Sequence, residues 1–510
     1  MRKSIWGLAL LVVVMFLASC SKKTEYTNAI PKDAAMVVSF DFKAMAQKSG
    51  IDGKEGEKVV AKLTDALKSG LEGNALKTAE KLVQNPSESG LSLTDKVYIF
   101  ATQQSSSFAL LAKVDDEGKL ENLLKALKDE QICEELKEED GSTWTKMGGA
   151  LCAFNNGTFM IMANIKGDAE GVKGTVLSLL HQEAENSFAS KSDFAKLSNA
   201  KGEIAMVMDM SIIPNEVTMQ MRMGLPADLK LEDMKFLVDI CFEKGKIVIN
   251  SESLIENKEL IASYEKQSTA TAPITGAYLE YFPVNTLAWA GGNINGGKIY
   301  EILCENPTIK QSMENPMLPI DIENIFSSIH GDIAFGFNSL TTNDLLVYAD
   351  VTNSEFLQSF EELRPLLAMT GGQMKLNTLG KDQYEFRMYG QGIWFGVKDN
   401  KLYISNNETM AKEAGRKYGA SLQNAPWAGD VAKNRVFMAF NVAQLVQELS
   451  ANPYLASRLG VDATAINAVL GPCEYMDLMG ADWKGGKMEI VMKDKNVNVL
   501  QLIVRGLEQL

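Results

Sequence analysis

Two stretches decide the fold: residues 95–114, DKVYIFATQQSSSFALLAKV, and residues 332–351, DIAFGFNSLTTNDLLVYADV. Each contains two runs rich in apolar, aromatic and β-branched residues with polar residues between them, which is typical of two strands joined by a turn. Each is followed by a segment with apolar residues at helical spacing, LENLLKAL at 120–127 and FLQSFEEL at 356–363. The chain is therefore predicted to build the same strand–strand–helix unit twice.

Four other pairs of segments recur in the same order, which favours duplication of the whole unit. The pairs are 30–42 with 282–294, 157–164 with 400–407, 202–210 with 434–442, and 242–250 with 483–491. We predict a first repeat at 30–268 and a second at 270–510, joined near QSTATAP at 267–273, where small and hydroxyl residues cluster.

The repeats predict the α+β class. Alternating apolar residues flank Glu243-Lys-Gly-Lys246, and a similar turn occurs at 482–487, so both sites read as β-hairpins. Strands joined by hairpins with helices between them indicate two similar halves, each an antiparallel sheet with helices packed on one face. How the halves pack is left open.

The N-terminus, MRKSIWGLALLVVVMFLASC, reads as a signal peptide over residues 1–19. Its apolar run, as a helix, spans roughly 20 Å against a hydrocarbon core of about 30 Å, too short for a lasting membrane span. Leu17-Ala-Ser-Cys20 resembles the lipobox of bacterial lipoproteins, which implies that Cys20 carries acyl chains such as palmitate. Residues 20–29 then form a lipidated tether, and Ser21 favours the outer membrane, facing the periplasm, with surface exposure left open.

The charge excludes some partners. Removal of residues 1–19 takes Arg2 and Lys3, so the net charge of −14 becomes −16. An acidic body of this size argues against nucleic acid as a partner and against adsorption to anionic headgroups.

Residues 292–298, GNINGGK, fit most of a phosphate-binding loop. Ile299 follows the lysine where a magnesium-binding hydroxyl is needed, and the corresponding segment of the first repeat has no glycine at the loop. We therefore expect no nucleotide, and interpret the segment as a strand-to-helix turn.

No other motif assigns chemistry. His181 and His330 have neither metal nor triad spacing, and the acidic clusters lack the alternation of a calcium loop. We assign no catalytic residue, metal ligand or cofactor. The sequence leaves enzymatic activity open and favours a non-enzymatic role.

A methionine-rich segment supplies a candidate ligand groove, because flexible thioethers line apolar grooves and also bind Cu(I). Core filling by a half-buried strand is the alternative for its first part. The residues are Met206, Met208, Met210, Met219, Met221 and Met223.

Five cysteines follow Cys20, an odd number without a CxxC motif, so buried free thiols are favoured and any disulfide pairing is left open. They are Cys133, Cys152, Cys241, Cys304 and Cys473.

With this lipobox, Ile30-Pro-Lys-Asp-Ala34 before a strand, and two similar halves, the chain resembles a family of large, uncharacterised Bacteroidetes lipoproteins. The resemblance implies a lipid-anchored envelope protein and brings no catalytic residues. Our first hypothesis is a binding or scaffolding protein whose partner is another envelope protein or an apolar or glycan ligand. Two alternatives are a hydrolase of periplasmic glycan or peptide polymer with unidentified carboxylates, and metal handling through residues 206–223.

Overall fold

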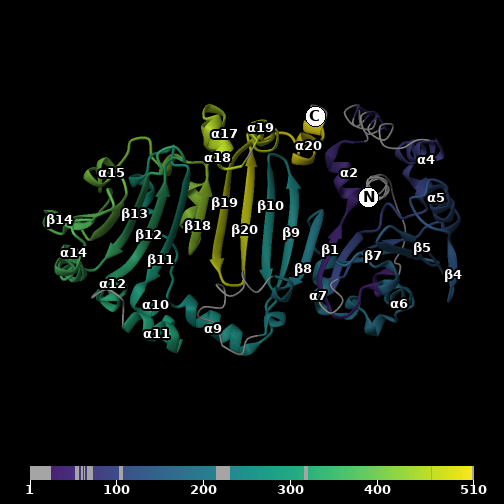
Figure 1. The fold of residues 1–510 in the computed structure, drawn as a ribbon, viewed down its shortest axis with the longest axis horizontal. Coiled ribbons are helices and arrows are strands. Elements are labelled where there is room, and N and C mark those ends of the chain that lie inside the picture. The colour runs from purple at the N-terminus through teal and green to yellow at the C-terminus, as the bar shows by residue number, and fades with distance from the viewer. Residues whose placement is uncertain are drawn as a thin grey trace. The chain divides into compact units, whose positions relative to one another are not determined.

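The computed structural model describes residues 25–51, 57–58, 61, 64–65, 73–102, 107–213, 230–314, 320–460 and 462–507. They form helices and a large antiparallel sheet, which confirms the α+β class (Figure 1). The signal peptide, Cys20, and three of the methionines, Met219, Met221 and Met223, lie outside the described residues.

The chain packs as two compact units. Unit 1 contains the described residues up to Ile255 together with those from Lys495 onward, and unit 2 contains Glu256–Asp494. The final helix α20 (Val499–Leu507) thus belongs to unit 1, where it packs against α2 (Phe42–Ser49). The repeats predicted at 30–268 and 270–510 stay a prediction, and the packing divides the chain at other points.

The described residues of unit 1 form ten strands in the spatial order β10-β9-β8-β1-β2-β3-β7-β6-β5-β4, and all neighbours are antiparallel. The strands are β1 (Ala34–Phe40), β2 (Val97–Thr102), β3 (Ser107–Lys113), β4 (Lys137–Glu139), β5 (Ser142–Met147), β6 (Ala150–Phe154), β7 (Thr158–Asn164), β8 (Ile204–Asp209), β9 (Lys235–Glu243) and β10 (Lys246–Ser253).

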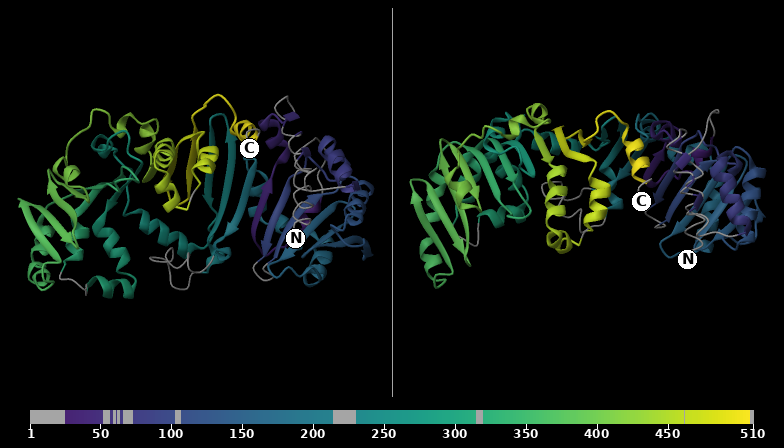
Figure 2. Two further views of the ribbon diagram at one scale, coloured as in Figure 1. Left: turned by 45° about the horizontal axis from the view of Figure 1, so that its top comes forward. Right: turned by 90° about the horizontal axis from the view of Figure 1, so that it is seen from above.

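Unit 2 also has ten strands among its described residues, in the order β20-β19-β18-β11-β12-β13-β17-β16-β15-β14, again antiparallel throughout. Figure 2 gives two further views of the helices and strands. The strands are β11 (Ala288–Asn295), β12 (Ile329–Phe337), β13 (Leu345–Val351), β14 (Met374–Gly380), β15 (Gln383–Met388), β16 (Gln391–Lys398), β17 (Lys401–Ser405), β18 (Val436–Phe440), β19 (Cys473–Asp482) and β20 (Gly485–Met492).

The described helices divide between the two units. Unit 1 contains α2, α4 (Gly73–Gln84), α5 (Glu117–Asp129), α6 (Ala169–Leu180), α7 (Ser192–Ser198) and α20. Unit 2 contains α9 (Lys258–Ser268), α10 (Gly296–Leu303), α11 (Pro307–Glu314), α12 (Ile322–Ser328), α13 (Gln358–Glu361), α14 (Arg364–Ala368), α15 (Glu408–Lys412), α16 (Ala428–Val431), α17 (Val442–Ala451), α18 (Pro453–Arg458) and α19 (Ala463–Leu470).

Helices cover both faces of the unit 1 sheet, so the prediction of helices on one face is wrong. Every residue of β6 is buried, and its alternate residues belong to two different core clusters. Leu120 and Leu124 of α5 join the cluster that contains Cys152, whereas Val176 of α6 joins the one that contains Leu151. Successive strand residues point to opposite faces, so α5 and α6 lie on opposite sides. The unbroken apolar run in β6 is the sequence signal for a strand buried on both faces.

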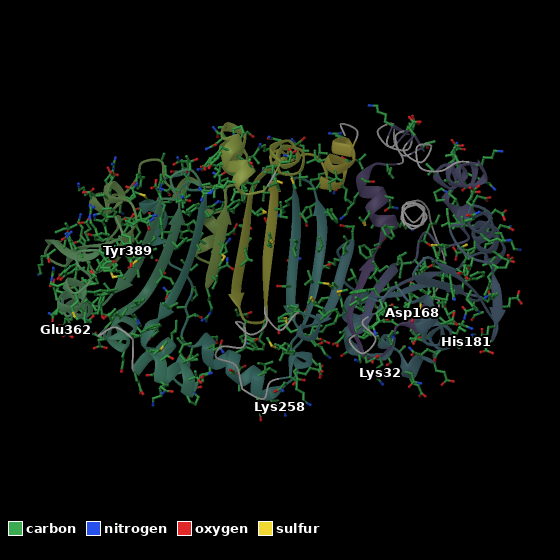
Figure 3. All side chains as sticks on the ribbon, in the orientation of Figure 1. Lys32, Asp168, His181, Lys258, Glu362 and Tyr389 are labelled. Atoms are coloured by element: carbon green, nitrogen blue, oxygen red, sulfur yellow. The ribbon has the colours of Figure 1, made fainter. Side chains whose placement is uncertain are left out.

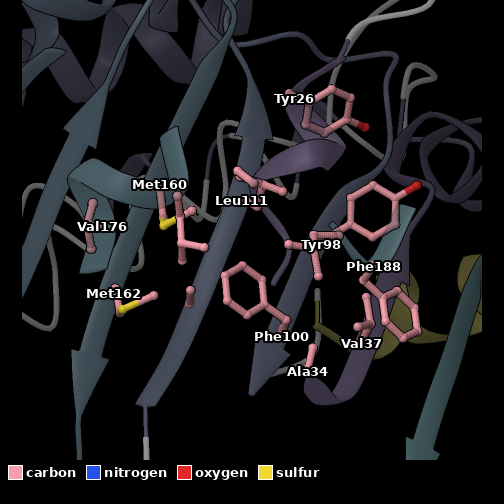
Figure 4. Close-up of a cluster of buried hydrophobic side chains, with 14 of the residues drawn as sticks. Tyr26, Ala34, Val37, Tyr98, Phe100, Leu111, Met160, Met162, Val176 and Phe188 are labelled. Atoms are coloured by element: carbon pink, nitrogen blue, oxygen red, sulfur yellow. The ribbon is translucent and has the colours of Figure 1, made fainter. Parts of the chain in front are cut away.

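The core around α6 positions the N-terminal end of unit 1 (Figure 4). Tyr26 of the short 3-10 helix η1 (Glu25–Ala29) packs beside Tyr98, with ring centroids 6.0 Å apart, and its hydroxyl donates to the carbonyl of Lys96 at 2.7 Å. Burial raises the pKa of Tyr26. Tyr26, six residues after Cys20 in the sequence, is therefore fixed in the core of unit 1.

Candidate functional site

The glycine-rich segment forms a strand and a helix start. β11 runs through Gly292, and α10 begins at Gly296, where the Asn295 side chain accepts from the Lys298 amide at 3.1 Å. A Cβ on Gly296 would lie 2.0 Å from the carbonyl oxygen of Phe326. The glycine is required by this close approach of backbone from α12, rather than by backbone flexibility.

The described methionines of the candidate groove divide between two environments. Met206 and Met208 lie half-buried on β8, on the face opposite to Ala205 and Val207 of the core. Met210 is buried and begins the 3-10 helix η5 (Met210–Ile212), so it does not continue the row. The groove as a whole stays a prediction.

The histidines and cysteines take structural positions. His181 caps the C-terminal end of α6, whose N-terminal cap is Asp168, and its Nε2 lies 3.0 Å from Ser142 Oγ (Figure 3). His330 is exposed on β12. All five described cysteines are free, and Cys133, Cys152 and Cys473 are buried. Within the described residues there is no cluster that could hold a metal ion, and no helix there is long and apolar enough to cross a bilayer.

Unit 1 contains a charged cavity of about 350 Å³ between the start of β1, the 3-10 helix η4 (Phe188–Ser190), α7 and the facing ends of β8 and β9. Asp209 and Lys235 are directly opposite on β8 and β9, and Lys235 Nζ lies 3.3 Å from Oδ2 of the buried Asp193. The charged residues of its lining are Asp33, Lys191, Asp193, Asp209, Glu232, Asp233 and Lys235.

Burial acts on two of these charges in opposite directions. Burial and then Lys235 lower the pKa of Lys191. Burial also raises the pKa of Asp209, although the Ser211 amide donates to its Oδ1 at 3.0 Å. Both shifts have the sign that loss of water produces, because a low dielectric disfavours the charged form of either group.

Unit 2 contains an aromatic cavity of about 270 Å³ between the start of β11, the 3-10 helix η9 (Leu422–Asn424), α16, the end of β18 and the start of β19. The Trp289 and Trp427 rings stack with centroids 5.8 Å apart, and Trp427 stacks on Phe437 at 5.4 Å. Its lining is Val284, Thr286, Trp289, Leu422, Asn424, Ala425, Pro426, Trp427, Ala439, Asn441, Ala443, Glu474 and Tyr475.

One cross-strand row begins in the lining of this aromatic cavity, at Trp289 and Ala439, and continues to Asp477, which does not line it. Trp289 on β11 is opposite Ala439 on β18, which is opposite Asp477 on β19. Trp289 and Asp477 are 3% and 4% exposed. Neither the Trp289 Nε1–H nor Asp477 Oδ1 has a hydrogen-bond partner. The small Ala439 thus separates an unpaired donor from an unpaired acceptor.

Asp477 also faces a second carboxylate. It is directly opposite Glu489 on β20, and Glu489 is ion-paired with Lys487. Burial, and then the charge of Glu489, raise the pKa of Asp477 to about 6. Burial, and then the charge of Asp477, raise the pKa of Tyr475 to about 12. This part of unit 2 therefore combines aromatic surface with an acid whose pKa lies near neutrality.

Sequence reasoning missed both cavities. Their residues come from four separated segments of each unit, and the tryptophans at 289 and 427 carry no motif. The available signal was the predicted pairing of segments 30–42 and 282–294, because both segments contribute residues to a cavity wall.

Part of the other face of the unit 2 sheet is apolar and exposed, around β11, β18 and β19. Phe335, Met438 and Leu478 share one cross-strand row through Ala290 and are 43%, 48% and 43% exposed. Exposed apolar surface of this kind is typical of interaction sites.

Comparison with known proteins gives similarity to solved structures over part of the chain. Two crystal structures of the protein TP0453, crystal forms III and I, are similar to it at 13% and 12% identity. They cover 49% and 46% of this chain and 88% and 80% of their own, with TM-scores of 0.29 and 0.27. None of the curated proteins compared with the chain matches it. The model of a domain of unknown function, DUF4836, matches residues 26–500, nearly the whole folded body, and the chain belongs to this family.

Proposed function

We propose that the protein is a lipid-anchored envelope protein, built by tandem duplication, that binds a ligand in the aromatic cavity of unit 2. The duplication is supported by the strand orders, which coincide when β1–β10 are matched in sequence to β11–β20. It is also supported by two equivalent bridges, Pro31 with Ser187 and Pro283 with Ser421.

The duplication places the two cavities at the same position in each unit. The Phe188 amide donates to Ile30 at 2.9 Å, and the Leu422 amide donates to Phe282 at 3.0 Å, so η4 corresponds to η9. Counting from these bonds, Lys191 and Asp193 of the charged cavity correspond to Ala425 and Trp427 of the aromatic one. Counting along the paired strands gives Asp209 with Asn441 and Lys235 with Tyr475.

The observation that carries the proposed function is the difference between these two cavities. They occupy equivalent positions in the two units, but charged residues line one and aromatic residues line the other. If packing alone determined these positions, side chains would fill the cavity in at least one unit, because an empty cavity lowers stability. Concave sites lined by aromatic residues and a few polar groups are the common form of small-ligand sites. The aromatic cavity is therefore the better candidate of the two.

Anchoring through Cys20 places this cavity beside a membrane. Tyr26, whose ring is fixed in the core, is six residues after Cys20. Six residues extend at most roughly 22 Å, so the folded body stays near the bilayer. By the sorting signal at Ser21 we place the protein on the periplasmic side of the outer membrane. In this setting the partners are molecules of the cell envelope. Because the lipid supplies the anchoring, the acidic body need not be attracted to lipid headgroups.

Native mass spectrometry of the lipidated protein, purified from detergent-solubilised envelopes, tests the binding role. We expect a bound small molecule on the wild type that is absent from Trp427→Ala. Asp193→Ala, which changes the corresponding position of unit 1, is the matched control and should retain it. Wild-type protein that repeatedly carries no bound species would refute the binding role.

A second candidate function, hydrolysis of a periplasmic glycan, is favoured by the facing pair of Asp477 and Glu489. Residues directly opposite on antiparallel strands have Cβ atoms about 5 Å apart, and retaining glycosidases hold two carboxyl groups close together. An acid with a pKa near 6 fits the proton-donor role. Release of reducing ends from envelope glycans, lost in Glu489→Gln, would establish it, and unchanged release in that variant would exclude this pair.

A further inference from the structure

The charged cavity of unit 1 is lined by charges that its counterpart in unit 2 lacks. At four positions where unit 1 has a charged side chain, unit 2 has a neutral one. The fold therefore accepts neutral side chains at all four, and the charges are not needed to build the sheet or the helices beside it. Because partial burial of a charge lowers stability, their presence in unit 1 indicates a role beyond folding. The four residues are Lys191, Asp193, Asp209 and Lys235.

These charges stand on two walls of the cavity. On the wall formed by η4 and the start of α7, Lys191 Nζ lies 5.4 Å from the ring centroid of Phe188. On the wall formed by the facing ends of β8 and β9, Asp209 is directly opposite Lys235. Lys235 reaches from the second wall to the first, where its Nζ lies 3.3 Å from Oδ2 of the buried Asp193. This ion pair leaves Lys191 on one wall and Asp209 on the other.

The two remaining charges have lost water without gaining an opposite charge in return. Among the residues that the structure describes, neither Lys191 nor Asp209 forms an ion pair. Burial lowers the pKa of Lys191, and the neighbouring Lys235 lowers it further. Burial raises the pKa of Asp209, against the hydrogen bonds that it accepts from Ser211. A ligand that brings a negative group to Lys191 and a positive group to Asp209 would stabilise both charges.

The balance of charge in the lining narrows the ligand class. The lining contains five acidic residues and two lysines, so its net charge is negative. An anion such as phosphate would face more carboxylates than lysines. A metal ion does not fit, because no three acids among the described residues are grouped closely enough to hold one. A simple amine would leave Lys191 without a partner, whereas a zwitterion with more amino groups than carboxylates matches both walls.

The size of the cavity limits the ligand further. At about 30 Å³ for each water-sized volume, the cavity of about 350 Å³ holds about twelve, which is room for a free amino acid with a long side chain or a small dipeptide. Phe188 and Val207 supply apolar surface for the methylene groups of such a ligand. Glu232 and Asp233, in the 3-10 helix η6 (Leu231–Asp233), supply carboxylates for a second amino group.

We infer that the charged cavity is a second binding site, which takes a basic amino acid or a short basic peptide with its carboxylate at Lys191 and an ammonium group at Asp209. The inference goes beyond the proposed function, because the site lies in the other unit and its ligand class is different. It assigns Lys191 as the residue that selects a free carboxylate, and Asp209 as the residue that selects an amine.

Calorimetric titration of the full mature protein tests this inference. The probes are lysine, ornithine and lysyl-alanine, each in three forms: free, as the C-terminal amide, which has no carboxylate, and fully N-acetylated, which has no ammonium group. We expect at least one free probe to bind with measurable heat. Its amide and its acetylated form should each bind about tenfold more weakly or worse, because each lacks one contact between opposite charges.

Two variants assign these contacts to residues. Lys191→Met removes the cation of one wall, so the free probe should bind no better than its amide. Asp209→Asn removes the carboxylate of the other wall, so the free probe and its amide should both weaken by about tenfold. Circular dichroism should show both variants folded, because unit 2 has neutral residues at these two positions.

An exposed ion pair of unit 1 supplies matched controls. Lys196 Nζ lies 2.7 Å from Glu252 Oε1, and neither residue lines the cavity. Lys196→Met and Glu252→Gln make the same changes of charge as the two site variants and should leave binding of the free probe unchanged.

The other outcomes count against the inference. It is overturned if no free probe binds, and also if the amides bind as tightly as the free probes, which would indicate a site for simple cations. Binding that is equal in wild type, Lys191→Met and Asp209→Asn overturns the assignment to this cavity, as does binding that is lost in Trp427→Ala. The proposed function of the aromatic cavity is judged separately, by the bound molecule that native mass spectrometry compares between wild type and Trp427→Ala.

Discussion

Asp477 on β19 lies directly opposite Glu489 on β20, and both carboxyl side chains are nearly buried, 4% and 9% exposed. Glu489 has Lys487 as its ion-pair partner, whereas Oδ1 of Asp477 has no hydrogen-bond partner. Two like charges on neighbouring strands destabilise a sheet. The relationship therefore predicts a measurable effect of pH on stability.

Asp477→Asn should stabilise the protein at pH 7. The pKa of Asp477 is about 6 in the folded state against 3.8 for the free side chain. Because the folded pKa is raised, protonation favours the folded state: the stability is fully present below pH 4 and is lost as pH rises through 6. At pH 7 the charge costs up to about 3 kcal/mol, at 1.36 kcal/mol per pKa unit, and the asparagine removes this cost.

Urea unfolding of wild type and Asp477→Asn from pH 4 to pH 8 measures the effect. The gain of the variant should be largest above pH 6 and fall toward zero near pH 4. Glu474→Gln, which removes another carboxylate of β19, is the control for a general change of net charge. A gain for Asp477→Asn that is equal at pH 4 and pH 8 would contradict the raised pKa.

A buried ion pair in unit 1 predicts a different mutational pattern. Lys113 Nζ lies 3.0 Å from Asp95 Oδ2, and Lys113 is 6% exposed. Lys113→Met removes one partner of a nearly buried pair, and such changes typically cost 3–5 kcal/mol. The double variant Lys113→Met with Asp95→Asn removes both charges and should recover most of this loss. Chemical unfolding of the two single variants and the double variant gives the coupling energy, and additive losses would contradict the pairing.

Comparison with unit 2 shows why the ion pair of Asp95 and Lys113 could not be predicted from the sequence. In the predicted pairing of segments 95–114 and 332–351, Asp332 and Asp350 stand at the positions of Asp95 and Lys113, so the second segment has two acids there. The Asp332 carboxylate accepts hydrogen bonds from the Thr275 and Gly276 amides and from Asn293 Nδ2, at 3.0, 3.1 and 2.8 Å. Asp350 accepts from the Tyr278 hydroxyl at 2.8 Å. The donors come from distant segments that no local pattern connects.

Local elements were predictable where periodicity and turn chemistry agree. The hairpin at 243–246 is confirmed by the pairing of Glu243 with Lys246, and the helix at 120–127 lies within α5. The cavities were not predictable, because burial of Trp289 and Asp477 depends on strand order across the sheet. Position along the sequence does not reveal that the Asp477 carboxylate, rather than that of Glu489, is buried without an ion-pair partner.

Adjacent glycines at the start of α10 should respond oppositely to alanine. A Cβ on Gly296 would clash with the backbone oxygen of Phe326, so Gly296→Ala must move α12 and should cost more than about 2 kcal/mol. A Cβ on Gly297 meets no heavy atom closer than 3.6 Å. Alanine is the better helix former there, so Gly297→Ala should be neutral or stabilise by up to about 1 kcal/mol.

Thermal unfolding of both variants, with ATP and magnesium added in a parallel series, checks this. Neither protein should be stabilised by ATP, because the segment is a structural turn. Loss of stability in Gly297→Ala alone would contradict the assignment of the close contact to Gly296.

Cys20→Ala should release the folded body from the membrane without unfolding it. The described fold begins at Glu25, and Tyr26 is held by the core and by the Lys96 carbonyl, so nothing in unit 1 depends on the lipid. A single acyl chain gives weak, reversible anchoring and two chains give stable anchoring, so the wild type should resist a high-salt wash. Fractionation of cell envelopes, with circular dichroism of the released variant, tests both parts. Ser21→Ala, which keeps the acylated thiol, should remain in the membrane fraction, and a Cys20→Ala protein that also remains there would refute anchoring through this cysteine.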